Sequence, residues 1–110
     1  MAIPHAAPGD LIDVRPLGAD LRSTSSTTLI RALHLEVFRF VLPAGKAAPD
    51  YRAAGALTIQ CLEGVVEFEA LGRKQMLRAG SLVYLDDAEP HAVTAIEDSS
   101  LLVTILLRRA

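Results

Sequence analysis

Short apolar stretches alternate with turn-forming residues along most of the chain, and this pattern predicts β-strands. Glycine, proline and acidic residues separate the stretches, as at Pro43, Gly64, Gly80 and Pro90. From residue 29 onward, no apolar repeat of about 3.6 residues extends to the length of a helix. The strands we expect lie at residues 29–42, 56–62, 65–70, 75–78, 81–85, 91–96 and 101–107.

The first part of the chain has a different pattern. Pro4, Pro8 and Pro16 interrupt any long element, and residues 23–28 are all serine or threonine. We therefore expect residues 1–28 to form an N-terminal extension, as a loop or an edge strand. Residues 29–110 are expected to form one all-β barrel domain with few or no helices.

Composition narrows the classes of function. The chain has 110 residues, which fits one domain, and it lacks an apolar run long enough for a membrane helix. The net charge of −2 comes without a basic patch, which argues against nucleic acid as a partner. The single cysteine, Cys61, cannot form an internal disulfide, and no signal peptide is recognisable, so we expect a cytoplasmic protein.

Two motifs are spaced around glycines. In the first, five residues separate Gly45 from Tyr51, Ala53 stands two places later, three residues precede Leu57, and six more lead to Gly64. In the second, five residues separate Gly80 from residues 86–88, two more precede His91, and three more precede Ala95. Glycines at such positions suit corners where the backbone needs a positive φ.

These spacings resemble the two motifs of the cupin family, and the resemblance covers residues 29–107, most of the chain. It implies a small single-domain bacterial cupin, whose fold is a double-stranded β-helix or jelly-roll barrel. In metal-binding cupins, two histidines and a glutamate of the first motif join the histidine of the second motif. Here Tyr51, Ala53 and Leu57 occupy the first three places, and only His91 remains.

One imidazole is too few for a transition-metal site, which takes three or four protein ligands. Placing Asp50 and Arg52 at the histidine positions does not help, because a guanidinium has no acceptor for a metal. We therefore expect a degenerate metal site, with no metal and no cofactor.

Six residues are candidates for the lining of a pocket inside the barrel. His91 would be a hydrogen-bonding or acid–base group, or a relic of the family's site. The hydroxyl of Tyr51 would point toward His91, whereas Arg52 should point away by strand alternation. Tyr84 is either a pocket residue or part of the core. The remaining candidates are Leu57, Ile59 and Cys61, which share one face of a strand.

Two further interpretations are weighed against simpler ones. Cys61 would be a nucleophile near His91 or, as we favour, a small buried apolar residue. His34 and Glu36 alternate on one face of the first long strand, and we favour a surface pair.

The function that we favour from the sequence is binding of a small metabolite in a metal-free barrel. One alternative is an isomerase or epimerase that uses His91 and Tyr51 as base and acid. Another is a metal-dependent oxygenase built on a non-standard site, so whether the protein is an enzyme stays open at this point. Apolar residues on both faces of strands such as 101–107 predict a homodimer. Neither the ligand nor the free space inside the barrel follows from the sequence.

Overall fold

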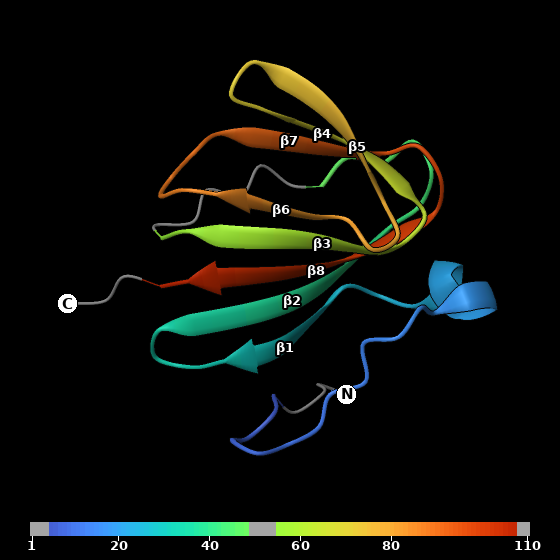
Figure 1. Cartoon of the computed structure of the whole chain (residues 1–110). Coiled ribbons are helices and arrows are strands. Elements are labelled where there is room, and N and C mark those ends of the chain that lie inside the picture. The colour runs from blue at the N-terminus through green and yellow to red at the C-terminus, as the bar shows by residue number, and fades with distance from the viewer. Residues whose placement is uncertain (1–4, 49–54, 108–110) are drawn as a thin grey trace.

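A computed structural model describes residues 5–48 and 55–107 of the chain. In these residues eight β-strands accompany one short 3-10 helix, η1 (Gly18–Ser23) (Figure 1). The strands are β1 (Thr27–Arg31), β2 (Leu35–Leu42), β3 (Leu57–Glu63), β4 (Val65–Ala70), β5 (Arg73–Arg78), β6 (Leu82–Leu85), β7 (His91–Ala95) and β8 (Ser99–Leu106).

The strands form two sheets, which lie one above the other in Figure 1. The larger sheet has the order β1-β2-β8-β3-β6 and the smaller sheet has the order β5-β4-β7. Every pair of neighbouring strands is antiparallel. The all-β fold expected from the sequence is therefore confirmed. No helix in the described residues is long and apolar enough to cross a membrane.

One face of each sheet supplies the core. In β3, Leu57, Ile59 and Cys61 are buried, and the residues between them are only partly covered. Burial of a side chain of leucine size contributes roughly 1.5–3 kcal/mol, so this interior face stabilises the whole barrel. The core comprises Leu42, Leu57, Ile59, Cys61, Val66, Phe68, Ala70, Leu77, Leu85, Val93, Ala95, Leu101, Val103 and Ile105.

The single strand expected at residues 29–42 is wrong, because this segment is a hairpin of β1 and β2. A backbone hydrogen bond from Ala32 N–H to Leu35 C=O, 2.8 Å long, closes the turn between them. Leu33 lies exposed in this turn. A continuous apolar pattern thus hid the turn, which contains no glycine or proline to mark it.

The glycines that frame the two motifs adopt the expected backbone geometry. Gly45, Gly64 and Gly80 have φ values of +84°, +85° and +92°. The requirement for glycine is strictest at Gly64, between β3 and β4. A Cβ atom there would overlap the Ser99 side chain and the Asp98 backbone oxygen. Only glycine fits this turn without displacing its neighbours.

The N-terminal segment packs on the outer side of the larger sheet. The Glu63 carboxylate accepts hydrogen bonds from the backbone N–H groups of Leu17 and Gly18, at 2.8 and 3.0 Å. The Arg39 guanidinium, on the outward face of β2, donates to the Arg15 backbone oxygen at 2.9 Å. Arg39 is consequently buried although it points away from the core.

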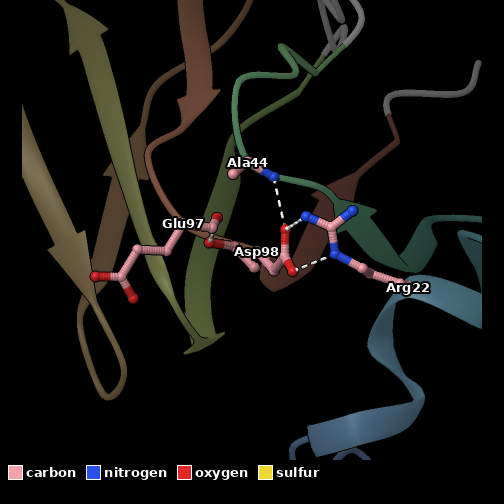
Figure 2. Close-up of polar contacts among 5 residues, drawn as sticks. Arg22, Ala44, Glu97 and Asp98 are labelled. Carbon is pink, nitrogen blue, oxygen red and sulfur yellow. Dashed lines mark hydrogen bonds and ion pairs between the residues drawn. The ribbon is translucent and has the colours of Figure 1, made fainter.

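A second attachment of this segment centres on Asp98, in the turn between β7 and β8 (Figure 2). Its carboxylate accepts from Nε and Nη2 of Arg22 at 2.6 and 3.0 Å. The same carboxylate accepts from the Ala44 backbone N–H at 2.8 Å. Asp98 thus joins η1, the loop after β2 and the last turn of the barrel.

Candidate functional site

His91 begins β7 at the end of the barrel where β3 also begins (Figure 1). It is paired with Ala70 in the smaller sheet, and both side chains face the larger sheet. Its Nδ1 lies 3.2 Å from the backbone oxygen of Glu89, and the Phe68 ring stacks near the imidazole with centroids 6.2 Å apart. Because a carbonyl oxygen only accepts hydrogen bonds, Nδ1 carries a proton in this contact.

A small apolar cavity lies inside the barrel beside His91. Its volume is about 20 Å³, enough for one water molecule or one methyl group. Among the described residues that line it, His91 is the only polar one. The lining comprises Phe40, Ala48, Leu57, Ile59, His91, Val93, Leu101 and Val103.

An open groove of about 450 Å³ lies on the other side of His91, at the barrel mouth. Ala48, His91 and Val93 line both the groove and the cavity, so these residues separate the two spaces. Small residues form much of the groove wall, and Glu69 and His91 are the ionisable side chains among the described lining residues. The other members are Ala47, Ala70, Leu71, Gly72, Pro90 and Ala92.

Three of the six pocket candidates come together in the structure. His91, Leu57 and Ile59 all line the cavity, as expected if the spacing of the two motifs brings positions 57 and 91 into one interior. Tyr51 lies outside the described residues, as do Arg52 and Ala53. Cys61 and Tyr84 are described but do not line the cavity.

Cys61 is fully buried, but it is not among the residues that line the cavity or the groove. Its Sγ lies 3.4 Å from the Glu63 backbone oxygen and 3.6 Å from that of Gly64, at the far end of β3. Burial raises the pKa of the Cys61 thiol and so disfavours the thiolate. The structure therefore favours the interpretation of Cys61 as a small buried core residue.

The expectation that Tyr84 lines the pocket needs correction. Ile59 pairs with Val83 across β3 and β6, and Leu57 pairs with Leu85, so these residues face inward. Tyr84, between them, points outward and is 62% exposed. Sequence alternation showed that Tyr84 and Leu82 share a face, but it did not show that this face is the outer one.

The surface pair expected at positions 34 and 36 is also incorrect. His34 is exposed in the turn between β1 and β2, whereas Glu36 in β2 is only 9% exposed. Glu36 pairs with the core residue Ile105, so it shares the inward face, and its carboxylate lies 3.7 Å from the Arg31 guanidinium. The turn at residues 32–34 interrupts the alternation on which the pair was based.

Five residues of the cavity wall were not among the sequence candidates. Phe40 comes from β2, Val93 from β7, and Leu101 and Val103 from β8, while Ala48 lies in the segment that pairs with β7. Alternation within each strand separates these residues from their outward neighbours. Choosing the inward set requires the pairing between strands, which the sequence does not provide.

The described residues around the cavity offer few donor atoms to a transition metal. Leu57, at the place of the glutamate in metal-binding cupins, contributes only a hydrocarbon side chain to the cavity beside His91. Within residues 5–48 and 55–107, no three His, Cys, Asp or Glu side chains cluster closely enough to hold an ion. His91 alone therefore provides the side-chain donor atoms among the described residues around the cavity.

Comparison with known proteins relates the fold to one superfamily. No protein-family model matches the sequence, and no curated protein matches it. Among solved structures, a cupin superfamily protein from Desulfitobacterium hafniense has a TM-score of 0.76 at 16% identity, covering 94% of this chain and 100% of its own. An RmlC-like cupin from Desulfovibrio desulfuricans has a TM-score of 0.71 at 25% identity, covering 88% and 97%.

An enzyme is also among the similar structures. The DMSP lyase DddQ from Ruegeria pomeroyi has a TM-score of 0.68 at 24% identity, and the match covers 88% of this chain and 55% of the lyase. Similarity at this level of identity concerns the fold, since one fold hosts many activities. The two antiparallel sheets and these likenesses together establish that the chain has the fold of the cupin superfamily.

Proposed function

We propose that this protein binds a small organic molecule at the barrel mouth, with His91 as its main polar contact. The observation that carries this proposal is that His91 belongs to the linings of both a small apolar cavity and an open groove. Apolar walls with a few convergent polar groups are typical of small-molecule sites. The groove, at about 450 Å³, is within the size range of such sites.

The dimensions restrict how the ligand lies. The cavity of about 20 Å³ accepts no more than a methyl-sized group, so most of the molecule must lie in the groove. This position differs from the one expected from the sequence, in which the metabolite is bound inside the barrel. A ligand in this position would contact the imidazole at one point and the small residues around Ala92 and Gly72 along the rest of its length.

We also propose that the site works without a metal. Leu57 and His91 support this, since only one of the two side chains offers a donor atom. Elemental analysis of protein purified without a metal-binding tag should give much less than one transition-metal ion per chain. A value near one per chain would contradict the proposal and would favour a metal-dependent oxygenase with a non-standard site.

The binding site can be tested by NMR with a library of small organic fragments. Binding at the proposed site should shift the resonances of His91, Val93 and Ala92, and His91→Ala should abolish saturable binding. His34→Ala is the matched control, because His34 is an exposed histidine in the turn between β1 and β2. Equal loss of binding in both variants, or fragments that bind only elsewhere, would count against the site.

A second candidate is an acid–base enzyme. The contact between Nδ1 of His91 and the Glu89 oxygen supports it, because this contact leaves Nε2 of a neutral ring as a base. Tyr51, the acid in this hypothesis, lies outside the described residues. The hypothesis predicts that His91→Phe removes turnover of a substrate found by screening while fragments still bind. Unchanged turnover in this variant would reject it.

We further propose that the protein is a homodimer formed by the outer face of β3, β6 and β8. On this face Leu82, Tyr84 and Leu106 are 63%, 62% and 55% exposed. The outward residues beside them include Thr58, Gln60 and Leu102, which are uncharged. The Asp86 carboxylate adjoins Tyr84 at the edge of this outer patch. Two such patches can meet through their apolar residues and leave the Asp86 carboxylate at the rim, which supports contact between copies. The cytoplasmic location expected from the sequence stays a prediction.

A further inference from the structure

We infer that Leu71, at the tip of the hairpin of β4 and β5, is a binding residue of the groove and holds an apolar end of the ligand, either alkyl or aromatic. Because Leu71 lines the same groove as His91, this role rests on the proposed function. Its basis is the backbone conformation of Leu71 together with the exposure of its side chain.

The backbone of Leu71 is in a conformation that disfavours leucine. Ala70 pairs with Arg73, so Leu71 and Gly72 alone form the loop of this hairpin. Their φ values are +54° and +74°, and two positive φ values in a two-residue loop are the pattern of a type I′ turn. Asparagine, aspartate or glycine is usual at the first of these positions, because the Cβ atom of a leucine crowds the next carbonyl oxygen without a polar group to compensate. Leucine therefore destabilises the turn in which it stands.

The side chain of Leu71 does not offset this cost by packing. It is 67% exposed, so it contributes little of the stability that a buried leucine would provide. The stability of the fold thus explains neither its backbone conformation nor its side chain. Strained residues of this kind are typical of binding sites, where the strain is kept because the side chain is used.

The position of the turn indicates where the side chain is used. Ala70 is paired with His91, so the next positions along the two chains, Leu71 and Pro90, lie at the same end of the smaller sheet. Both line the groove, and Leu71 has the largest hydrocarbon side chain among its described lining residues. Ala88, the other described non-glycine residue with a positive φ, at +55°, lies two positions before Pro90. Both strained turns therefore adjoin the same groove.

The surface around Leu71 determines the kind of group that would bind there. Pro90 and Ala92, which line the groove with Leu71, are also exposed and offer only hydrocarbon side chains. An alkyl or aromatic group placed on them would remove apolar surface of both molecules from water. A polyol or sugar would gain nothing from the leucine. The apolar end of the ligand is therefore the part that Leu71 holds.

A series of carboxamides of increasing chain length tests this contact: acetamide, butyramide and hexanamide. Carboxamides are uncharged and both donate and accept hydrogen bonds, so neither the charge of Glu69 nor the proton position on His91 enters the comparison. In the wild type, the dissociation constant, measured from saturable NMR shifts of Ala92 and Val93, should fall roughly two- to fourfold for each added methylene. In Leu71→Asn most of this gain should be lost, whereas Leu71→Met should retain it.

The melting temperature supplies a readout that a packing role would not produce. Leu71→Asn should raise the melting temperature by about 4–8 °C, because asparagine tolerates the left-handed conformation and little packing is lost. One substitution would thus stabilise the fold and weaken the site. Ala88→Gly is the matched control, since it relieves the same kind of strain at a residue outside the groove lining. It should leave the affinity for hexanamide unchanged.

The outcomes separate this role from the proposed function. If the dependence on chain length is the same in Leu71→Asn as in the wild type, or is lost equally in Ala88→Gly, the site stands but Leu71 is not its apolar contact. A lower melting temperature in Leu71→Asn would mean that the side chain packs within the fold, and it would overturn the inference too. If none of the three carboxamides shifts the Ala92 and Val93 resonances saturably, the proposed site itself is overturned.

Discussion

Glu63 connects the barrel to the N-terminal segment through a single carboxylate. Besides the N–H groups of Leu17 and Gly18, it accepts a hydrogen bond from the buried Ser100 hydroxyl at 2.5 Å. Burial acts to raise the pKa of Glu63, but the hydrogen bonds from Ser100, Leu17 and Gly18 outweigh it and hold the pKa below its ordinary value of 4.5. The ionised form is therefore the one that the fold stabilises.

Replacing Glu63 with alanine should lower the free energy of unfolding by about 2 kcal/mol, because charged hydrogen bonds are lost and Ser100 is left without its acceptor. Urea denaturation measures this change. Glu69→Ala is the matched control, since Glu69 is exposed and accepts no hydrogen bond from a described residue. Similar losses in the two variants would mean that the Glu63 contacts contribute little.

The stabilisation from Glu63 should depend on pH. Since the pKa in the folded state is below 4.5, the contribution is complete above pH 4.5 and declines as the pH falls through the folded-state pKa. The difference in stability between the wild type and Glu63→Gln should therefore shrink on acidification. A difference that grows below pH 4.5 would show that the sign of the pKa shift is wrong.

Substitutions at Gly64 and Gly72 separate two costs of an added Cβ atom, namely the strained backbone conformation and the steric clash with neighbouring atoms. Both have positive φ, +85° and +74°, but an added Cβ would collide with Ser99 only at Gly64. Gly72→Ala should therefore lower stability by about 1 kcal/mol, from backbone conformation alone. Gly64→Ala should prevent folding or shift the melting temperature far more. Equal melting temperatures in the two variants would refute the role of the Ser99 contact.

At the scale of elements, the described N-terminal residues behave as a strap over the larger sheet. The strap comprises residues 5–26, and a hydrogen bond from the Ala6 N–H to the Leu29 backbone oxygen fixes it beside β1. Leu21, in η1, is its buried apolar anchor. Three further attachments use charged side chains, at Glu63, Arg39 and Asp98. The Ser26 hydroxyl adds an uncharged one, since it accepts a hydrogen bond from the Val41 N–H at 2.8 Å.

Removal of the Asp98 carboxylate should loosen two elements together. In Asp98→Ala, backbone amides of η1 and of residues 43–46 should exchange hydrogen faster, because the contacts to Arg22 and Ala44 are lost. Hydrogen exchange followed by mass spectrometry measures this. Glu97→Ala is the control, since the Glu97 side chain points away from this junction in Figure 2. Unchanged exchange in η1 would show that the Asp98 carboxylate does not hold this helix in place.

At the scale of the whole molecule, one face of the larger sheet remains uncovered. The strap covers the outer side near β2, where Val37 and Arg39 are buried. The outer side of β3 and β6 has no cover in the described chain and exposes Leu82 and Tyr84. A second copy would protect this patch from water, which is the basis of the proposed homodimer.

Light scattering should therefore give twice the chain mass of 11.8 kDa for the wild type. Leu82→Glu should reduce the mass to that of one chain, because two buried carboxylates would face each other. Leu33→Glu should leave the dimer intact, since Leu33 is equally exposed but lies in the turn between β1 and β2. A wild-type mass of 11.8 kDa at micromolar concentration would contradict the dimer.

The sequence alone determined the fold class, the positions of most strands and the convergence of positions 57 and 91. These follow from local properties: apolar alternation, turn residues, and glycines that adopt positive φ. The loss of donor chemistry at Leu57 also required only the residue types, once the motif spacing was recognised.

The tertiary structure alone decided which face of each strand is inward. Alternation has a period of two and does not fix its own phase, so Tyr84 and Glu36 were assigned to the wrong sides. The turn at residues 32–34, the attachment of Leu17 to Glu63, and the size of the cavity beside His91 depend on contacts between distant segments. Packing of both sheets sets these features, and no local pattern records them.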